Sequence, residues 1–101
     1  MRVKATFASR IGPKNQLVTV GVLVLSPKGL LFRGLPGMDS LEAEIQQDID
    51  MAALKIDPAS VFEYYATSGN GVTTEWSEPF VGNGKNAEEI AAKLLDTLES
   101  K

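Results

Sequence analysis

The cations near the start of the sequence are the residues with the most evident chemistry. Arg2 and Lys4 alternate with apolar residues in the opening stretch MRVKATFASR. Residues 1–38 hold six Lys and Arg residues and no acid, whereas residues 39–101 hold four cations and all thirteen acids. In a chain of net charge −3, this asymmetry indicates an anionic partner or an oppositely charged surface.

Five cations form the candidate anion-binding set. Arginine and lysine bind phosphates and carboxylates, and backbone amides at the start of a helix also attract anions. One member of the set belongs to the loop GNGKN (82–86), between an expected strand and an expected helix. The set consists of Arg2, Lys4, Arg10, Lys14 and Lys85.

Each of these basic features also has a plain structural explanation. A Walker loop has Gly five residues before its Gly-Lys pair and Ser or Thr after it, but Pro79 and Asn86 occupy those positions here. We therefore interpret 82–86 as a loop that ends in a helix cap. The early cations either neutralise the acids across the fold or, if residues 2–8 form an edge strand, protect that edge from unwanted pairing.

Catalytic chemistry has few candidates in this composition. The chain has no His and no Cys, which excludes imidazole bases, the usual triads, thiolate nucleophiles and disulfides. Glu63, Glu75 and Glu78 remain as carboxylates for acid–base work or Mg²⁺, but exposed carboxylates on a hairpin commonly serve solubility. We predict a non-enzymatic protein without catalytic residues, metal ligands or cofactor.

Aromatic residues cluster between positions 62 and 76. Aromatic rings on an open sheet stack bases in single-strand binders, but the acids on these segments would repel phosphates. Core packing for one half of the cluster, and contact with a partner protein or a second copy for the other half, is the favoured interpretation. The candidate protein interface comprises Tyr65, Trp76, Phe62 and Tyr64.

The first third of the chain predicts three strands. Alternation in 2–8 places apolar and cationic residues on opposite faces, which is typical of a half-buried strand. Residues 17–25 are apolar on both faces and predict a central strand that is covered on both sides. The turn SPKG (26–29) leads into a third strand at 30–33, so the three strands should form a meander.

Two helices and two further strands are expected in the remainder. Asp39 and Glu42 have capping-box spacing before an apolar stripe at helical period, and Asn86 and Glu89 repeat that spacing. The Asn-Gly pair at 70–71 is a strong hairpin signal. The expected elements are a helix at 39–55, strands at 61–67 and 72–80, and a helix that begins after Asn86.

These elements predict one α+β domain over residues 1–101, in the order βββαββα. The length of 101 residues suits one domain, and 44% hydrophobic with 23% charged residues is typical of a globular protein. Each helix has one apolar stripe that must be buried, so we expect an antiparallel sheet with the two helices packed on one face.

The sequence also bears on location. The longest apolar run, LVTVGVLVL (17–25), is much shorter than a membrane span, and charged residues interrupt the N-terminal stretch where a signal peptide has its apolar region. The lack of Cys fits a reducing compartment. We expect a cytoplasmic protein with no membrane partner.

The stretch SRIGPKNQLVTVGVLVLSPKG (9–29) resembles the opening of an uncharacterised bacterial domain family sometimes encoded beside HipA-type toxin kinases. That family has an Arg-x-x-Pro loop, a strand close to Val-Asn-Val-Gly-Val and a turn with Pro. Thr19 stands where the family has Asn. The matching positions here are Arg10, Pro13, VTVGV (18–22) and Pro27. The resemblance implies a bacterial or phage origin. It assigns no activity, because the family has no established function.

Two shorter stretches resemble other families. FRGLPGMDSLEAEI (32–45) is similar to the strand, Leu-Pro-Gly and helix passage of HicB-type antitoxins, with a shorter loop. GNGKNAEEIAAKLL (82–95) is similar to the last helix of double-stranded-RNA-binding domains, but Glu88 and Glu89 replace the lysine pair that contacts phosphate.

The leading functional hypothesis is a small interaction protein of the inhibitor, antitoxin-like or accessory kind, which acts by binding a protein partner or a second copy. The alternative is a binder of nucleic acid or of a phosphate-bearing small ligand, through the basic N-terminal strands and the 82–86 loop.

Overall fold

The chain folds into five strands and three helices within the residues that the computed structural model describes, which are 2–68, 74–77 and 79–99. The expected α+β class is confirmed. None of the helices in these ranges has the length and hydropathy of a membrane-spanning segment. The elements are β1 (Arg2–Ile11), β2 (Leu17–Ser26), β3 (Gly29–Gly34), α1 (Asp39–Ala53), α2 (Pro58–Ser68), β4 (Thr74–Trp76), β5 (Phe80–Asn83) and α3 (Ala87–Glu99).

The described strands form one antiparallel sheet in which β1 is an interior strand. β2 pairs with β1 on one side and with β3 on the other, so the expected meander is confirmed. The second side of β1 is shared, since β5 pairs with residues 2–5 and β4 with residues 8–10. Because β1 is bonded on both sides, its cations do not protect an edge.

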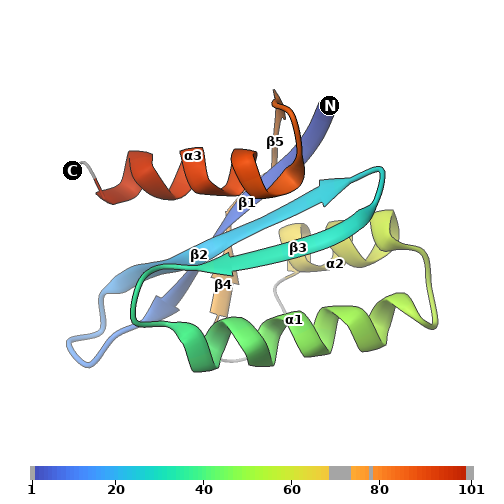
Figure 1. Ribbon diagram of the computed structural model, residues 1–101. Coiled ribbons are helices and arrows are strands. Elements are labelled where there is room, and N and C mark those ends of the chain that lie inside the picture. The colour runs from blue at the N-terminus through green and yellow to red at the C-terminus, as the bar shows by residue number, and fades with distance from the viewer. Residues whose placement is uncertain (1, 69–73, 78, 100–101) are drawn as a thin grey trace.

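Helices cover both faces of the sheet (Figure 1). α1 and α2 lie on one face, where Leu23 and Phe32 belong to the larger core cluster. The last helix, α3, was expected beside the first helix but packs on the opposite face against Val22 and Val24. The reason lies in β2, because a strand with large apolar side chains on both faces needs cover on both sides.

The segment 61–67, expected to be a strand, is instead the body of helix α2. Asp57 caps this helix: its carboxylate accepts bonds from the Ser60 backbone N–H (2.9 Å) and hydroxyl (2.8 Å). Pro58 occupies the first helical position, where its missing N–H costs nothing. The Asp-Pro pair therefore begins a helix here in addition to following one, and tertiary packing overrides the strand propensity of the aromatic run.

The two expected capping boxes have different outcomes. Asn86 caps α3 as expected, because its Oδ1 accepts the backbone N–H of Glu89 at 2.7 Å. The residue before α1 is Met38, which makes no side-chain capping bond. Glu42 does not serve as a cap partner, because its carboxylate binds strand β3 instead, where the Gly34 N–H donates to Oε2 at 3.0 Å.

The expected strand at 72–80 is divided into β4 and β5. Ser77 lies between them and holds the chain to β1, since the Phe7 N–H donates to its Oγ and its own N–H donates to the Phe7 carbonyl, both at 3.0 Å. The buried Thr6 hydroxyl donates to the Ser77 carbonyl. The Asn-Gly pair at 70–71 lies outside the described residues.

Gly21 permits a close approach between β2 and β3. A Cβ at this position would lie 2.4 Å from the Arg33 carbonyl oxygen and 2.6 Å from the Phe32 ring. Next to Gly21, the pairing of β1 with β2 shifts its register. Ala8 pairs with Gly21 and Ser9 pairs with Thr19, so Val20 is the extra residue of β2. Val20 is thereby buried in the α1/α2 core.

Candidate binding groove

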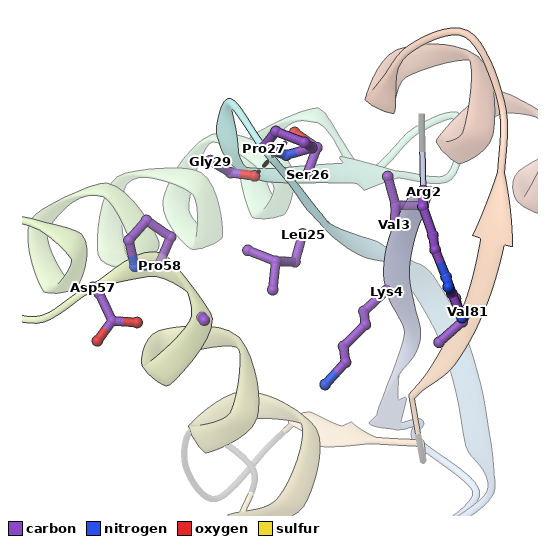
Figure 2. Close-up of a pocket in the computed structure, with 11 residues that line it drawn as sticks. Arg2, Val3, Lys4, Leu25, Ser26, Pro27, Gly29, Asp57, Pro58 and Val81 are labelled. Carbon is purple, nitrogen blue, oxygen red and sulfur yellow. Dashed lines mark hydrogen bonds between the residues drawn. The ribbon is translucent and has the colours of Figure 1, made fainter.

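A groove of about 590 Å³ lies between the start of β1 and the start of α2; we call it the β1–α2 groove (Figure 2). Its walls come from four separate segments of the chain. Apolar side chains form most of the lining, and two cations and one carboxylate are its charged members. The lining includes Arg2, Val3, Lys4, Leu25, Pro27, Asp57, Pro58, Ala59 and Val81.

The two cations of the groove come from alternate positions of β1 and therefore share one face of the sheet. Both residues are exposed. The Lys4 Nζ lies 3.0 Å from Oε1 of Glu63 on α2, with side chains that are 49% and 47% exposed. An ion pair this exposed contributes at most about 1 kcal/mol and weakens with salt. Arg2 makes no ion pair with a described residue, so its charge remains available to a ligand.

The N-terminus of α2 borders the groove but is already occupied. The hydrogen bonds that Ser60 donates hold the pKa of the Asp57 carboxyl below its ordinary value, so this group is charged at neutral pH. The carboxylate complements the helix dipole and accepts the first free backbone donors. An anion bound in the groove would be attracted by Arg2 and Lys4, while Asp57 would repel it from the helix end.

The five predicted anion-binding cations do not meet in one patch. Arg10 follows Arg2 by eight positions on the same strand, which is roughly 26 Å at the usual rise per residue. Arg10 borders a second hollow, of about 480 Å³, beside the turn that contains Lys14. Lys85 lies in the connection from β5 to α3. Only Arg2 and Lys4 share a groove.

The four predicted interface aromatics are also divided. Phe62 and Tyr65 are buried in the α1/α2 core, and Tyr65 packs edge-to-face on the half-buried Trp76 at 5.4 Å between ring centroids. Tyr64 lies on the outer face of α2 and is 54% exposed. The helical period explains this division, because positions 62, 65 and 66 share a face that excludes position 64. Among the four, Tyr64 offers the most exposed surface to a partner.

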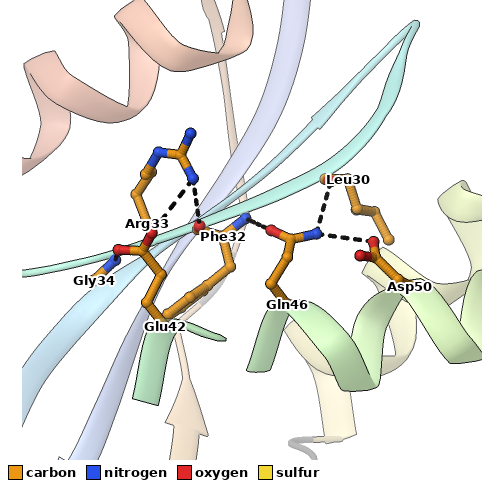
Figure 3. Close-up of polar contacts among 7 residues, drawn as sticks. All are labelled: Leu30, Phe32, Arg33, Gly34, Glu42, Gln46 and Asp50. Carbon is orange, nitrogen blue, oxygen red and sulfur yellow. Dashed lines mark hydrogen bonds and ion pairs between the residues drawn. The ribbon is translucent and has the colours of Figure 1, made fainter. Parts of the chain in front are cut away.

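One edge of the sheet is closed by side chains of α1 (Figure 3). The Phe32 N–H donates to Oε1 of Gln46 at 2.8 Å, and Nε2 of Gln46 donates to the Leu30 carbonyl at 3.4 Å. Glu42 accepts the Gly34 N–H and pairs with Arg33 at 3.4 Å. The Phe32 N–H, the Leu30 carbonyl and the Gly34 N–H, which point outward from β3, thus have partners, which protects this edge from pairing with another chain.

Aliphatic residues are exposed at two ends of the fold, and Leu17 is exposed although it belongs to the run 17–25 that was expected to be covered on both sides. Met51, Leu54 and Ile56 are exposed at the end of α1, where the apolar stripe continues past the helix. Ile11 and Leu17 are exposed where β1 turns into β2. The apolar walls of the β1–α2 groove were missed, because no local pattern links positions 25, 58 and 81.

The groove combines apolar walls with two cations and one carboxylate. Across the described parts of the chain, no cluster of three or more Asp or Glu residues is arranged to hold a metal ion. No protein-family model matches the chain, and neither the curated proteins nor the solved structures contain a significant match.

Proposed function

We propose that this chain is a small non-enzymatic interaction protein, of the inhibitor, antitoxin-like or accessory kind, that binds a segment of a partner protein in the β1–α2 groove. The observation that carries the proposal is that one groove combines apolar walls with an exposed Arg2 that forms no ion pair with any acid the structure describes. Ligand sites in proteins are mostly apolar hollows with a few placed polar groups, and this volume is within their usual range.

The chemistry of the lining favours an amphipathic segment with acidic residues. Leu25 and Val81 can bury aliphatic side chains of a ligand, and Arg2 can form a bidentate pair with a carboxylate. Lys4 adds positive charge, but a carboxylate of the ligand must compete with Glu63 for it. A peptide with alternating apolar and acidic residues satisfies both kinds of surface.

The alternative, binding of nucleic acid or a phosphate-bearing small ligand, has less support. Backbone phosphates are bound by several cations acting together along one surface. Here Arg2 and Arg10 lie at opposite ends of β1, Asp57 places negative charge in the groove that Arg2 lines, and Glu63 pairs with Lys4.

The proposal includes a cytoplasmic location and a bacterial or phage origin. A chain without Cys is suited to a reducing compartment. The origin rests on the resemblance of residues 9–29 to a bacterial family.

The test is selection of peptides of about twelve residues from a random displayed library, with the full chain as target. Selected peptides should be rich in acidic and aliphatic residues. Fluorescence anisotropy should then show about tenfold weaker binding to Arg2→Glu, equivalent to the loss of one good charge-assisted contact. Lys14→Glu makes the same charge change at the far end of the sheet and should bind like the wild type.

Two results would contradict the proposal. One is selected peptides that bind Arg2→Glu and the wild type equally. The other is an empty selection together with binding of a single-stranded oligonucleotide that weakens steeply with salt, which would support the alternative function.

A further inference from the structure

The outer edge of β5 carries backbone groups that face away from the sheet. The Phe7 N–H donates to the Ser77 hydroxyl and the Phe7 carbonyl accepts the Ser77 N–H, so both Phe7 groups point toward the β4–β5 side of β1. Because backbone direction alternates along a strand, the N–H and C=O groups of Val3 and Ala5 also point to this side, toward their partners Gly82 and Phe80. The alternate positions of β5, Val81 and Asn83, therefore turn their N–H and C=O groups outward.

This edge differs from the opposite one. At β3, Gln46 and Glu42 bind the outward backbone groups. At β5, no hydrogen bond from a described residue reaches the outward groups of Val81 or Asn83. An unpaired strand edge is a template for an extended segment of another chain, because main-chain bonds supply affinity without regard to sequence.

The open edge adjoins the β1–α2 groove. Val81 is paired with Lys4, so the two side chains share the face of the sheet that lines the groove, and Val81 is 52% exposed (Figure 2). A strand added outside β5 would lie about 10 Å from β1. Extended acidic side chains on that strand and the long side chain of Arg2 can meet across this separation.

We propose that β5 accepts an extended, acidic segment of the partner protein as an added strand, with alternate side chains directed into the β1–α2 groove. This inference rests on the proposed function and specifies how the partner is held. A second copy of the chain is the less suitable occupant, because the edge it would offer, Phe80–Asn83, has no acid to pair with Arg2 or Lys4.

The test uses the peptides selected from the random library in two N-methylated forms. In one form the methyl groups replace every second amide hydrogen, and in the other they replace the remaining ones. An added strand directs only one of the two sets toward β5. One form should therefore lose at least about tenfold in affinity while the other binds nearly as well as the parent peptide.

Val81→Pro supplies the matching change in the protein. Proline removes the outward N–H, and the bonds of Phe80 and Gly82 to β1 do not require it, since proline is tolerated on edge strands. We expect about tenfold weaker peptide binding, whereas Val81→Thr, which keeps the N–H, should bind like the wild type. Circular dichroism checks the fold, and if Val81→Pro is unfolded, the N-methylated peptides decide.

The outcomes separate the two proposals. Equal binding of both methylated forms, with weaker binding to Arg2→Glu, would overturn strand addition and leave the groove proposal intact. An empty selection would overturn both. A third outcome is that no peptide binds, the chain dimerises and the dimer is lost in Val81→Pro. This result would assign the edge to a second copy and overturn the proposal that an acidic segment of a partner binds there.

Discussion

Separate replacement of Phe62 and Tyr64 by alanine tests the conformation of the segment that the sequence predicts as a strand. Residues two positions apart share a face on a strand but point in different directions on a helix. In α2, Phe62 is fully buried and Tyr64 is 54% exposed. The helix therefore predicts unequal losses of stability from the two substitutions, and a strand predicts similar ones.

The size of the difference follows from the packing. Truncation of a fully buried Phe costs about 3–5 kcal/mol. Tyr64 has one edge-to-face contact, with Tyr65 at 5.5 Å between ring centroids, and such a contact is worth about 0.5–1.5 kcal/mol. Phe62→Ala should thus lower the free energy of unfolding by at least about 1.5 kcal/mol more than Tyr64→Ala.

Urea unfolding measures this difference. Trp76 is the single tryptophan of the chain and packs on Phe32 and Tyr65, so its fluorescence reports the α1/α2 core. Far-UV circular dichroism follows the helices independently. Tyr64→Phe keeps the exposed ring and serves as the control, with stability close to the wild type. Losses for the two alanine variants that agree within about 0.5 kcal/mol would refute the helical assignment.

Three further predictions concern the sheet and a helix cap. Gly21→Ala should prevent the native β2–β3 approach and lower the urea midpoint strongly, and near-wild-type unfolding would contradict the close contact. Gln46→Ala should leave the Phe32 N–H without its partner and lower the free energy of unfolding by about 1–3 kcal/mol. It should also promote association through the β3 edge, which sedimentation measures. Unchanged stability together with unchanged sedimentation would contradict the closure of this edge. Asp57→Ala should lower the urea midpoint at neutral pH. Because the pKa of the Asp57 carboxyl is lower in the folded than in the unfolded chain, the difference in midpoint between wild type and variant should disappear as the pH falls through the lowered pKa. A difference that persists in acid would exclude the carboxylate cap.

Local patterns predicted the elements whose signals agree with one another. Residues 17–25 are apolar on both faces, and the structure covers β2 on both sides over residues 20–24, whereas Leu17 and Val18 are exposed. The Asn86 cap and the apolar stripe that follows it correctly predict α3. Where turn residues, caps and periodicity point to the same element, the sequence is a sufficient guide.

Conflicting signals explain the main error. The run VFEYYAT favours a strand by propensity, but Asp57 and Pro58 form a helix start. The same pair also follows α1, so it separates two helices rather than a helix and a strand. The buried set at positions 61, 62, 65 and 66 has the spacing of a helix face, and this pattern was the signal that could have corrected the prediction.

The candidate site was only partly accessible from the sequence. The charge asymmetry identified Arg2 and Lys4, which do line the β1–α2 groove. The groove itself combines the ends of β1 and β2 with α2 and β5, and this arrangement depends on sheet order rather than on any local pattern. Closure of the β3 edge by Gln46 is likewise a long-range contact without a local sequence signal.

The most direct test of peptide binding in the β1–α2 groove is a titration of the full ¹⁵N-labelled chain with a selected acidic peptide, in which the amide chemical shifts are measured. Binding in the β1–α2 groove predicts the largest shifts at Val3, Lys4, Ala59 and Val81, which line it, and little change at Lys14 or Leu54. Shifts concentrated at the β1–β2 turn or at the exposed end of α1, with the groove unchanged, would contradict it.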